Sequence, residues 1–206
     1  MDSVSFLEVY DKPTLADNER ARLRSALGEA DRAAAIVTNR PSTAPAGVLN
    51  TPEAEIGVRT AGFAALPVVA SGELGWCALR RGLDPQTFLK PSPVHMLAGL
   101  RRAIGDPPAA AVDAAAGLHV EGVVDSAWRG LDGATLVLFE DAPKGHASAR
   151  AAVDLLAQRG ISVKLDLYGI AANPDKVAAL RAAGARVHAD LRLALDEVLP
   201  GWRSQV

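Results

Sequence analysis

Short apolar runs rich in valine, isoleucine and leucine alternate along the chain with longer stretches rich in alanine, leucine and arginine. In the longer stretches apolar residues recur about every three or four positions, which is typical of amphipathic helices, whereas the short runs are typical of buried strands. Strands that alternate with helices in this way form parallel sheets with helices on both faces. The pattern therefore predicts an α/β fold.

The predicted elements follow one another without a repeat or a low-complexity tract. We interpret them as a single core domain over residues 1–206, in which residues 1–32 form an N-terminal segment of uncertain placement and the less regular residues 106–132 an insertion. One further helix is expected to carry Leu74, Cys77 and Leu79, with Cys77 buried. The other predicted elements are strands over 33–39, 66–70, 134–141, 161–170 and 186–190, and helices over 14–30, 93–105, 146–160, 173–185 and 191–199.

Composition and charge exclude several classes of partner and agree with the predicted α/β fold. The chain has 206 residues, 49% hydrophobic and 22% charged, with a formal net charge of −2, as in ordinary globular proteins. We expect no nucleic-acid partner, because no basic window carries stacking aromatic residues. We expect no membrane partner, because no apolar stretch reaches about 18 residues. The single cysteine and the lack of a secretory signal favour a cytoplasmic protein.

Polar side chains follow two of the predicted strands at the point where each strand ends. Thr38–Arg40 closes one strand, Glu140–Asp141 closes another, and Lys90 stands before a helix between them in sequence. In open parallel sheets, ligands bind just outside the carboxyl ends of the strands. A hydroxyl group, a lysine and paired carboxylates together could hold a phosphoryl group and its magnesium ion.

Three short runs resemble signature motifs of one enzyme superfamily. The runs "IVTNRPS" (36–42), "FLKPSPVHML" (88–97) and "LVLFEDAPKG" (136–145) resemble the second, third and fourth motifs of the haloacid dehalogenase superfamily, in that order. The resemblance covers roughly residues 33–190. It implies a Rossmann-like three-layer sandwich with a mostly parallel central sheet. In most members it also implies magnesium-dependent phosphoryl transfer through an aspartyl-phosphate. No clear cap domain lies between the motifs.

The resemblance also implies a role for each residue at the strand ends. Thr38 would hydrogen-bond the transferred phosphoryl group, with Asn39 beside it in the phosphate site. Lys90 would neutralise the phosphoryl charge and steady the nucleophile. Glu140 and Asp141 would hold a magnesium ion, and Asp141 is the stronger candidate of the two.

The first motif of the superfamily, which supplies the nucleophile, is not recognisable in this sequence. In the superfamily it reads D-x-D-x-T, where the first aspartate is the nucleophile and the second the acid/base. The nearest match is Asp11, which precedes Thr14, but Pro13 stands where the second acid is expected. Glu8 matches no better, because Tyr10 stands two residues after it. Without these two groups the covalent step lacks its nucleophile and the leaving group lacks its proton donor.

The strand that carries the first motif is central in the resembling fold, so its place must be filled. One interpretation is that residues 4–10 form this strand. Another is that its place in the sheet is closed or is filled in another way, for example by a partner chain. A third interpretation makes residues 6–11 the last turns of a cap helix, because Phe6, Val9 and Tyr10 have helical spacing.

The candidate residues also have plain structural explanations. Thr38 is a common type of residue at the end of a strand, and Lys90 before two prolines is commonly a solvated lysine near a helix start. Glu140–Asp141 could cap the helix that follows, because acids stabilise helix N-termini. The histidines have no ligand spacing to one another or to acids, so we expect no histidine metal site.

Two functions of different classes agree with these patterns. The first is a magnesium-dependent phosphohydrolase that acts on a small phosphorylated metabolite, with Asp11 as nucleophile or with the first motif supplied by another chain. The second is a non-catalytic relative that keeps a phosphate or anion pocket, or only the scaffold, for binding or assembly. The expected partner is a small phosphorylated molecule or anion, and a homo-oligomer or a partner chain agrees with both functions.

Overall fold

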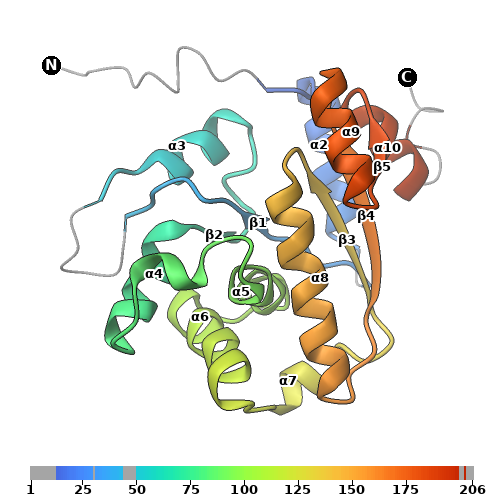
Figure 1. Cartoon of the computed structure of the whole chain (residues 1–206). Coiled ribbons are helices and arrows are strands. Elements are labelled where there is room, and N and C mark those ends of the chain that lie inside the picture. Colours follow the sequence, from blue (N-terminus) through green and yellow to red (C-terminus); the bar gives the residue numbers. More distant parts are fainter. Residues whose placement is uncertain (1–12, 30, 44–49, 200–201, 203–206) are drawn as a thin grey trace, which may run out of the picture. The chain divides into compact units, whose positions relative to one another are not determined.

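A computed structural model describes residues 13–29, 31–43, 50–199 and 202 (Figure 1). The chain divides into two compact units, which are described one after the other. Unit 1 comprises Met1–Leu89 with Val94–Val123, and unit 2 comprises Lys90–Pro93 with Val124–Val206. One core domain over residues 1–206 stays a prediction.

Unit 1 contains a short two-stranded parallel sheet. β1 (Ile36–Val37) pairs with β2 (Val68–Val69). The N–H of Thr38 donates to the carbonyl of Val69 at 3.0 Å and extends the pairing to the strand end. The remaining elements are α2 (Asp17–Leu27), α3 (Glu53–Thr60), α4 (Ser71–Arg80), a 3₁₀ turn η1 (Pro85–Phe88), α5 (Pro93–Ala103), α6 (Pro108–Ala116) and a π-helical turn η2 (Gly117–Glu121).

The buried side chains of unit 1 come mainly from α4, α5 and α6. Helix α4 buries Leu74 and Cys77, so the predicted burial of Cys77 is confirmed. Leu79 lies two positions from Cys77, about 200° around the helix, and is 56% exposed. Its place in an apolar run is therefore no sign that it belongs to the core.

Unit 2 contains a three-stranded parallel sheet with the order β3-β4-β5. In its register, Glu140 lies opposite Gly169, and Tyr168 lies opposite Arg186. Each strand is followed by a helix, as the alternating pattern predicts. The elements are α7 (Ser126–Arg129), β3 (Thr135–Glu140), α8 (Pro143–Gln158), β4 (Lys164–Ile170), α9 (Pro174–Ala182), β5 (Arg186–His188) and α10 (Leu191–Val198).

Helices cover both faces of the sheet in unit 2. A methyl group at Gly169 would contact Leu180 of α9, and one at Gly145 of α8 would overlap Glu140, so α8 and α9 lie on the face shared by Glu140 and Gly169. On the opposite face, Glu197 of α10 lies 3.1 Å from His188 of β5. The side chain of Glu140 therefore lies on the face that α8 covers.

The predicted α/β class and the parallel pairing of strands are confirmed. Among the described residues the strands form two small sheets, because β3 pairs only with β4 and β1 only with β2. The stretch 106–132, predicted as an irregular insertion, is mostly helical and contains α6, η2 and α7. Within the described part of the chain, no helix has the length and apolar character needed to cross a membrane.

Candidate functional site

An ion pair in unit 2 joins two of the predicted site residues. The Nζ atom of Lys90 lies 2.5 Å from Oε2 of Glu140, and the two residues are 50 positions apart in the chain. Their side chains are only 9% and 12% exposed. Charged side chains are rarely buried to this degree unless they are paired, so the two groups stabilise each other's burial.

Gly145, in the first turn of α8, makes room for the Glu140 carboxylate. A methyl group added at Gly145 would overlap the carboxylate of Glu140. The other carboxylate oxygen, Oε1, accepts a hydrogen bond from the N–H of Asp141 at 3.1 Å. One carboxylate oxygen of Glu140 thus faces Lys90, and the other faces the backbone at the end of β3. The predicted site residues did not include Gly145, because the predicted helix begins at residue 146, whereas α8 begins at Pro143 and includes Gly145 in its first turn.

The segment that carries Lys90 is anchored to the same helix. The hydroxyl group of Ser148, which is fully buried in α8, donates to the carbonyl of Ser92 at 2.6 Å. The peptide bond between Lys90 and Pro91 is cis. Helix α8 therefore anchors the segment of Lys90 through Ser92 and leaves room for the carboxylate of Glu140 at Gly145.

Asp141 faces a different lysine. Its Oδ2 atom lies 3.1 Å from Nζ of Lys176, and both side chains are more than half exposed. Partial burial raises the pKa of Asp141, but the hydrogen bonds to Lys176 and Glu140 and the positive charge of Lys176 outweigh it. The pKa of Asp141 therefore lies below the ordinary carboxyl value. At neutral pH Asp141 is an ionised, accessible carboxylate.

The carboxylates at the end of β3 could supply only one or two ligands to a magnesium ion. Magnesium is commonly held by one or two carboxylates, with water and substrate phosphate as its other ligands. Asp141 fits this pattern, whereas one oxygen of Glu140 is taken by Lys90. No group of three or more histidine, cysteine, aspartate or glutamate side chains in the described residues could hold a metal ion.

In unit 1, the loop that follows β1 is held in place by hydrogen bonds. The N–H of Arg40 donates to Oγ1 of Thr38 at 3.2 Å, and the carbonyl of Arg40 accepts from both the N–H and the hydroxyl group of Ser71 at 3.2 Å. The N–H of Ala54 donates to the carbonyl of Pro41 at 2.8 Å. The polar strand end is thus a fixed loop bonded to the first turns of α3 and α4.

Ser42 caps α4 from this loop, although it precedes the helix by 29 residues in the chain. The N-cap residue, Ala70, has no side-chain oxygen. Ser42 is buried; its hydroxyl oxygen accepts from the N–H of Gly72 at 3.2 Å and its hydroxyl group donates to Glu73 at 2.9 Å. A methyl group at Gly72 would lie 2.6 Å from the Ser42 carbonyl oxygen. No local pattern reveals this cap, because it joins residues that are distant in sequence.

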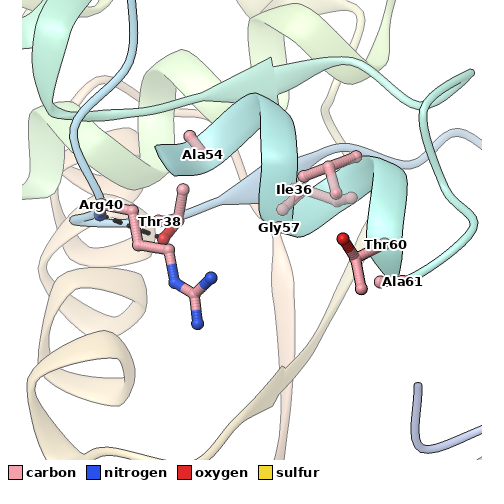
Figure 2. A pocket seen from close by; sticks show the side chains of 8 residues that line it. Ile36, Thr38, Arg40, Ala54, Gly57, Thr60 and Ala61 are labelled. Carbon is pink, nitrogen blue, oxygen red and sulfur yellow. Dashed lines mark hydrogen bonds between the residues drawn. The ribbon is translucent and has the colours of Figure 1, made fainter. Parts of the chain in front are cut away.

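A hollow of about 360 Å³ lies beside Thr38, between β1 and α3 (Figure 2). Figure 2 shows Thr38 and Arg40 at one end of the hollow, and Thr60 and Ala61 at the other. Its remaining walls are apolar or small. The lining residues are Ile36, Thr38, Arg40, Ala54, Gly57, Val58, Thr60 and Ala61.

The predicted site residues thus fall into separate groups. Lys90, Glu140 and Asp141 are brought together in unit 2. Thr38 and Asn39 lie in the fixed loop of unit 1, where Thr38 lines the hollow and Asn39 is exposed. Asp11 lies outside the described residues.

Comparisons with models of known protein families, with curated proteins and with solved structures give no significant match.

Proposed function

We propose that the chain is a haloacid dehalogenase-like phosphohydrolase with a Rossmann-like three-layer core that acts on small phosphorylated metabolites. The observation that carries the proposal is the contact between Lys90 and Glu140 at 2.5 Å. These residues belong to the runs that resemble the third and fourth motifs, and their contact agrees with the roles that the resemblance implies.

The proposed chemistry is phosphoryl transfer to a carboxylate and then to water. In the first step Asp11 attacks the phosphorus atom, the ester P–O bond breaks, and the departing oxygen takes its proton from solvent water, because Pro13 stands where the second acid is expected. In the second step water attacks the phosphoryl group on Asp11, which releases inorganic phosphate and restores the carboxylate. Thr38 donates its hydroxyl hydrogen to a phosphoryl oxygen, since Oγ1 already accepts a bond from Arg40.

The charged residues of unit 2 would balance the charge of the substrate. Lys90 supplies a positive charge, and its pairing with Glu140 fixes the position of the ammonium group. Asp141, ionised at neutral pH, would hold the magnesium ion with Glu140 as a weaker second ligand. Bound magnesium would neutralise charge on the phosphoryl oxygens.

Phosphate release from a panel of phosphomonoesters, with and without magnesium, tests this proposal. We expect turnover that depends on magnesium, that falls on the order of a thousandfold or more in Asp11→Asn, and that needs at least about tenfold more magnesium in Asp141→Asn. Asp154→Asn, on the exposed side of α8, is the matched control and should behave as wild type. Turnover that Asp11→Asn leaves unchanged would remove Asp11 as nucleophile.

A second candidate function is non-catalytic binding of a phosphate or another anion. The pairing of both strand-end carboxylates with lysines, Glu140 with Lys90 and Asp141 with Lys176, favours it, because the acids are compensated without any ligand. Calorimetric binding of phosphomonoesters without release of phosphate, at any magnesium concentration, would support this function against the first.

A further inference from the structure

The exposed carboxylate at the end of β3 is bound by a lysine from the neighbouring strand–helix pair. Asp141 directly follows β3, and Lys176 lies in the first turn of α9, which follows β4. Because β3 and β4 are parallel neighbours, both segments begin at the same edge of the sheet. The Nζ atom of Lys176 lies 3.1 Å from Oδ2 of Asp141. An oxygen atom of the residue that the proposed function assigns to magnesium is therefore bound to an ammonium group.

Lys176 stands where a helix disfavours a positive charge. The first turn of a helix carries the positive end of its dipole, so a cation there is destabilising. The N–H groups of Asp175 and Lys176 donate to Oδ1 of Asn173 at 2.9 and 3.2 Å, which fixes this turn of α9. The ion pair with Asp141 offsets the unfavourable field at Lys176. The contact thus gives an electrostatic reason for a lysine at this position.

The two lysine–carboxylate pairs at this strand end differ in exposure. The side chains of Lys90 and Glu140 are 9% and 12% exposed. Those of Lys176 and Asp141 are 57% and 63% exposed. Separating a buried pair is costly because each charge loses its partner without gaining water, whereas an exposed pair contributes little to stability. Asp141 can therefore exchange its lysine for another cation, whereas Glu140 keeps Lys90.

We propose that Lys176 competes with magnesium for the carboxylate of Asp141 and thereby sets the magnesium concentration at which the site fills. Magnesium binds carboxylate oxygens, and two cations beside one carboxylate repel each other. Either Lys176 leaves Asp141 when magnesium binds, or magnesium binds against the charge of the ammonium group. Both cases weaken magnesium binding. The inference rests on the proposed function, which assigns magnesium to Asp141, and it adds a control of that same site.

A magnesium titration of the full, isotope-labelled chain, followed by NMR, tests the inference without turnover. The backbone amide of Asp141 reports binding, and the ionic strength is held constant so that screening does not change. We expect Lys176→Met to lower the Kd for magnesium about threefold to tenfold. Asp141→Asn should raise this Kd at least about tenfold, which shows that the titrated site contains Asp141.

Two further variants separate the contact from a general effect of charge. Lys176→Arg keeps a cation that pairs with carboxylates and should leave the Kd within about twofold of wild type. Lys164→Met makes the same substitution at the first residue of β4, at the opposite end of the strand. It should change the Kd less than about twofold. An equal gain of affinity in Lys176→Met and Lys164→Met would show an effect of net charge alone and would overturn the inference.

Failure of this inference and failure of the proposed function give different results. Magnesium affinity that rises in Lys176→Met, without release of phosphate from any phosphomonoester, supports the competition and removes the hydrolase. Turnover that needs the same magnesium concentration in wild type and Lys176→Met removes the competition and leaves the hydrolase. A Kd that Lys176→Met leaves unchanged, or the absence of magnesium binding by both proteins, overturns the inference.

Discussion

Replacing Lys90 by methionine will leave the Glu140 carboxylate without its cation in a position that water hardly reaches. The two side chains are 9% and 12% exposed, and Nζ and Oε2 are 2.5 Å apart. At an effective dielectric constant of about 20, the Coulomb attraction at this distance is about 7 kcal/mol. The cost of removing both charges from water offsets much of this attraction. A single substitution should therefore destabilise the protein by about 3–5 kcal/mol.

The double variant Lys90→Met/Glu140→Gln should be much less destabilised than the two single variants taken together. It carries no unpaired charge, and replacing a whole buried pair is often close to neutral. We expect a coupling free energy of about 2–4 kcal/mol in the double-mutant cycle. Urea unfolding of wild type, both single variants and the double variant, followed by circular dichroism, measures this quantity.

Additive effects in this cycle, with a coupling below about 0.5 kcal/mol, would show that Lys90 and Glu140 do not interact in solution. That result would remove the observation on which the proposed function rests. Gly145→Ala is an independent probe of the same contact. It should destabilise by about 1–3 kcal/mol because its methyl group overlaps the Glu140 carboxylate, although alanine is the better helix former.

Three further predictions concern other parts of the chain. Ser42→Ala should lower the free energy of unfolding by about 1–2 kcal/mol, because the N–H of Gly72 loses its acceptor; a change in urea midpoint smaller than the experimental error would contradict the cap. Burial raises the pKa of the Cys77 thiol, so its reaction with a disulfide reagent at pH 8 should be at least about tenfold slower in the folded protein than in denaturant. The pKa of Asp141 is lowered in the folded protein, so the stabilisation by Asp141 is present at neutral pH and is lost as the pH falls through that pKa. Because Asp141 and Lys176 are more than half exposed, this stabilisation is at most a few tenths of a kcal/mol. NMR titration should show a higher pKa of Asp141 in Lys176→Met, and an unchanged pKa would contradict the pairing.

The fold class could be predicted because each element is specified locally. The run at 134–141 is apolar and ends on two acids, and β3 ends at Glu140. The alternation of strands and helices indicates parallel pairing, which all three strand pairs show. The division of the described strands into two small sheets could not be predicted, because pairing between strands distant in the chain leaves no local pattern.

The candidate site was predictable only in part, for a similar reason. The positions of Lys90 and Glu140 follow from their runs, but their contact depends on Gly145 and Ser148 of α8. The cap formed by Ser42 joins two segments far apart in sequence. The hollow is lined by residues of β1 and of α3, which are distant in sequence. Each feature is a tertiary contact, and periodicity carries no information about such contacts.

The most direct test of the proposed phosphohydrolase is to stop turnover of a small phosphomonoester with acid and map the phosphorylated peptide by mass spectrometry. An aspartyl-phosphate survives in acid, so the account predicts a phosphoryl group on the peptide that contains Asp11 and none in Asp11→Asn. Phosphate release without a phosphorylated peptide, or no release from any phosphomonoester, would contradict the account.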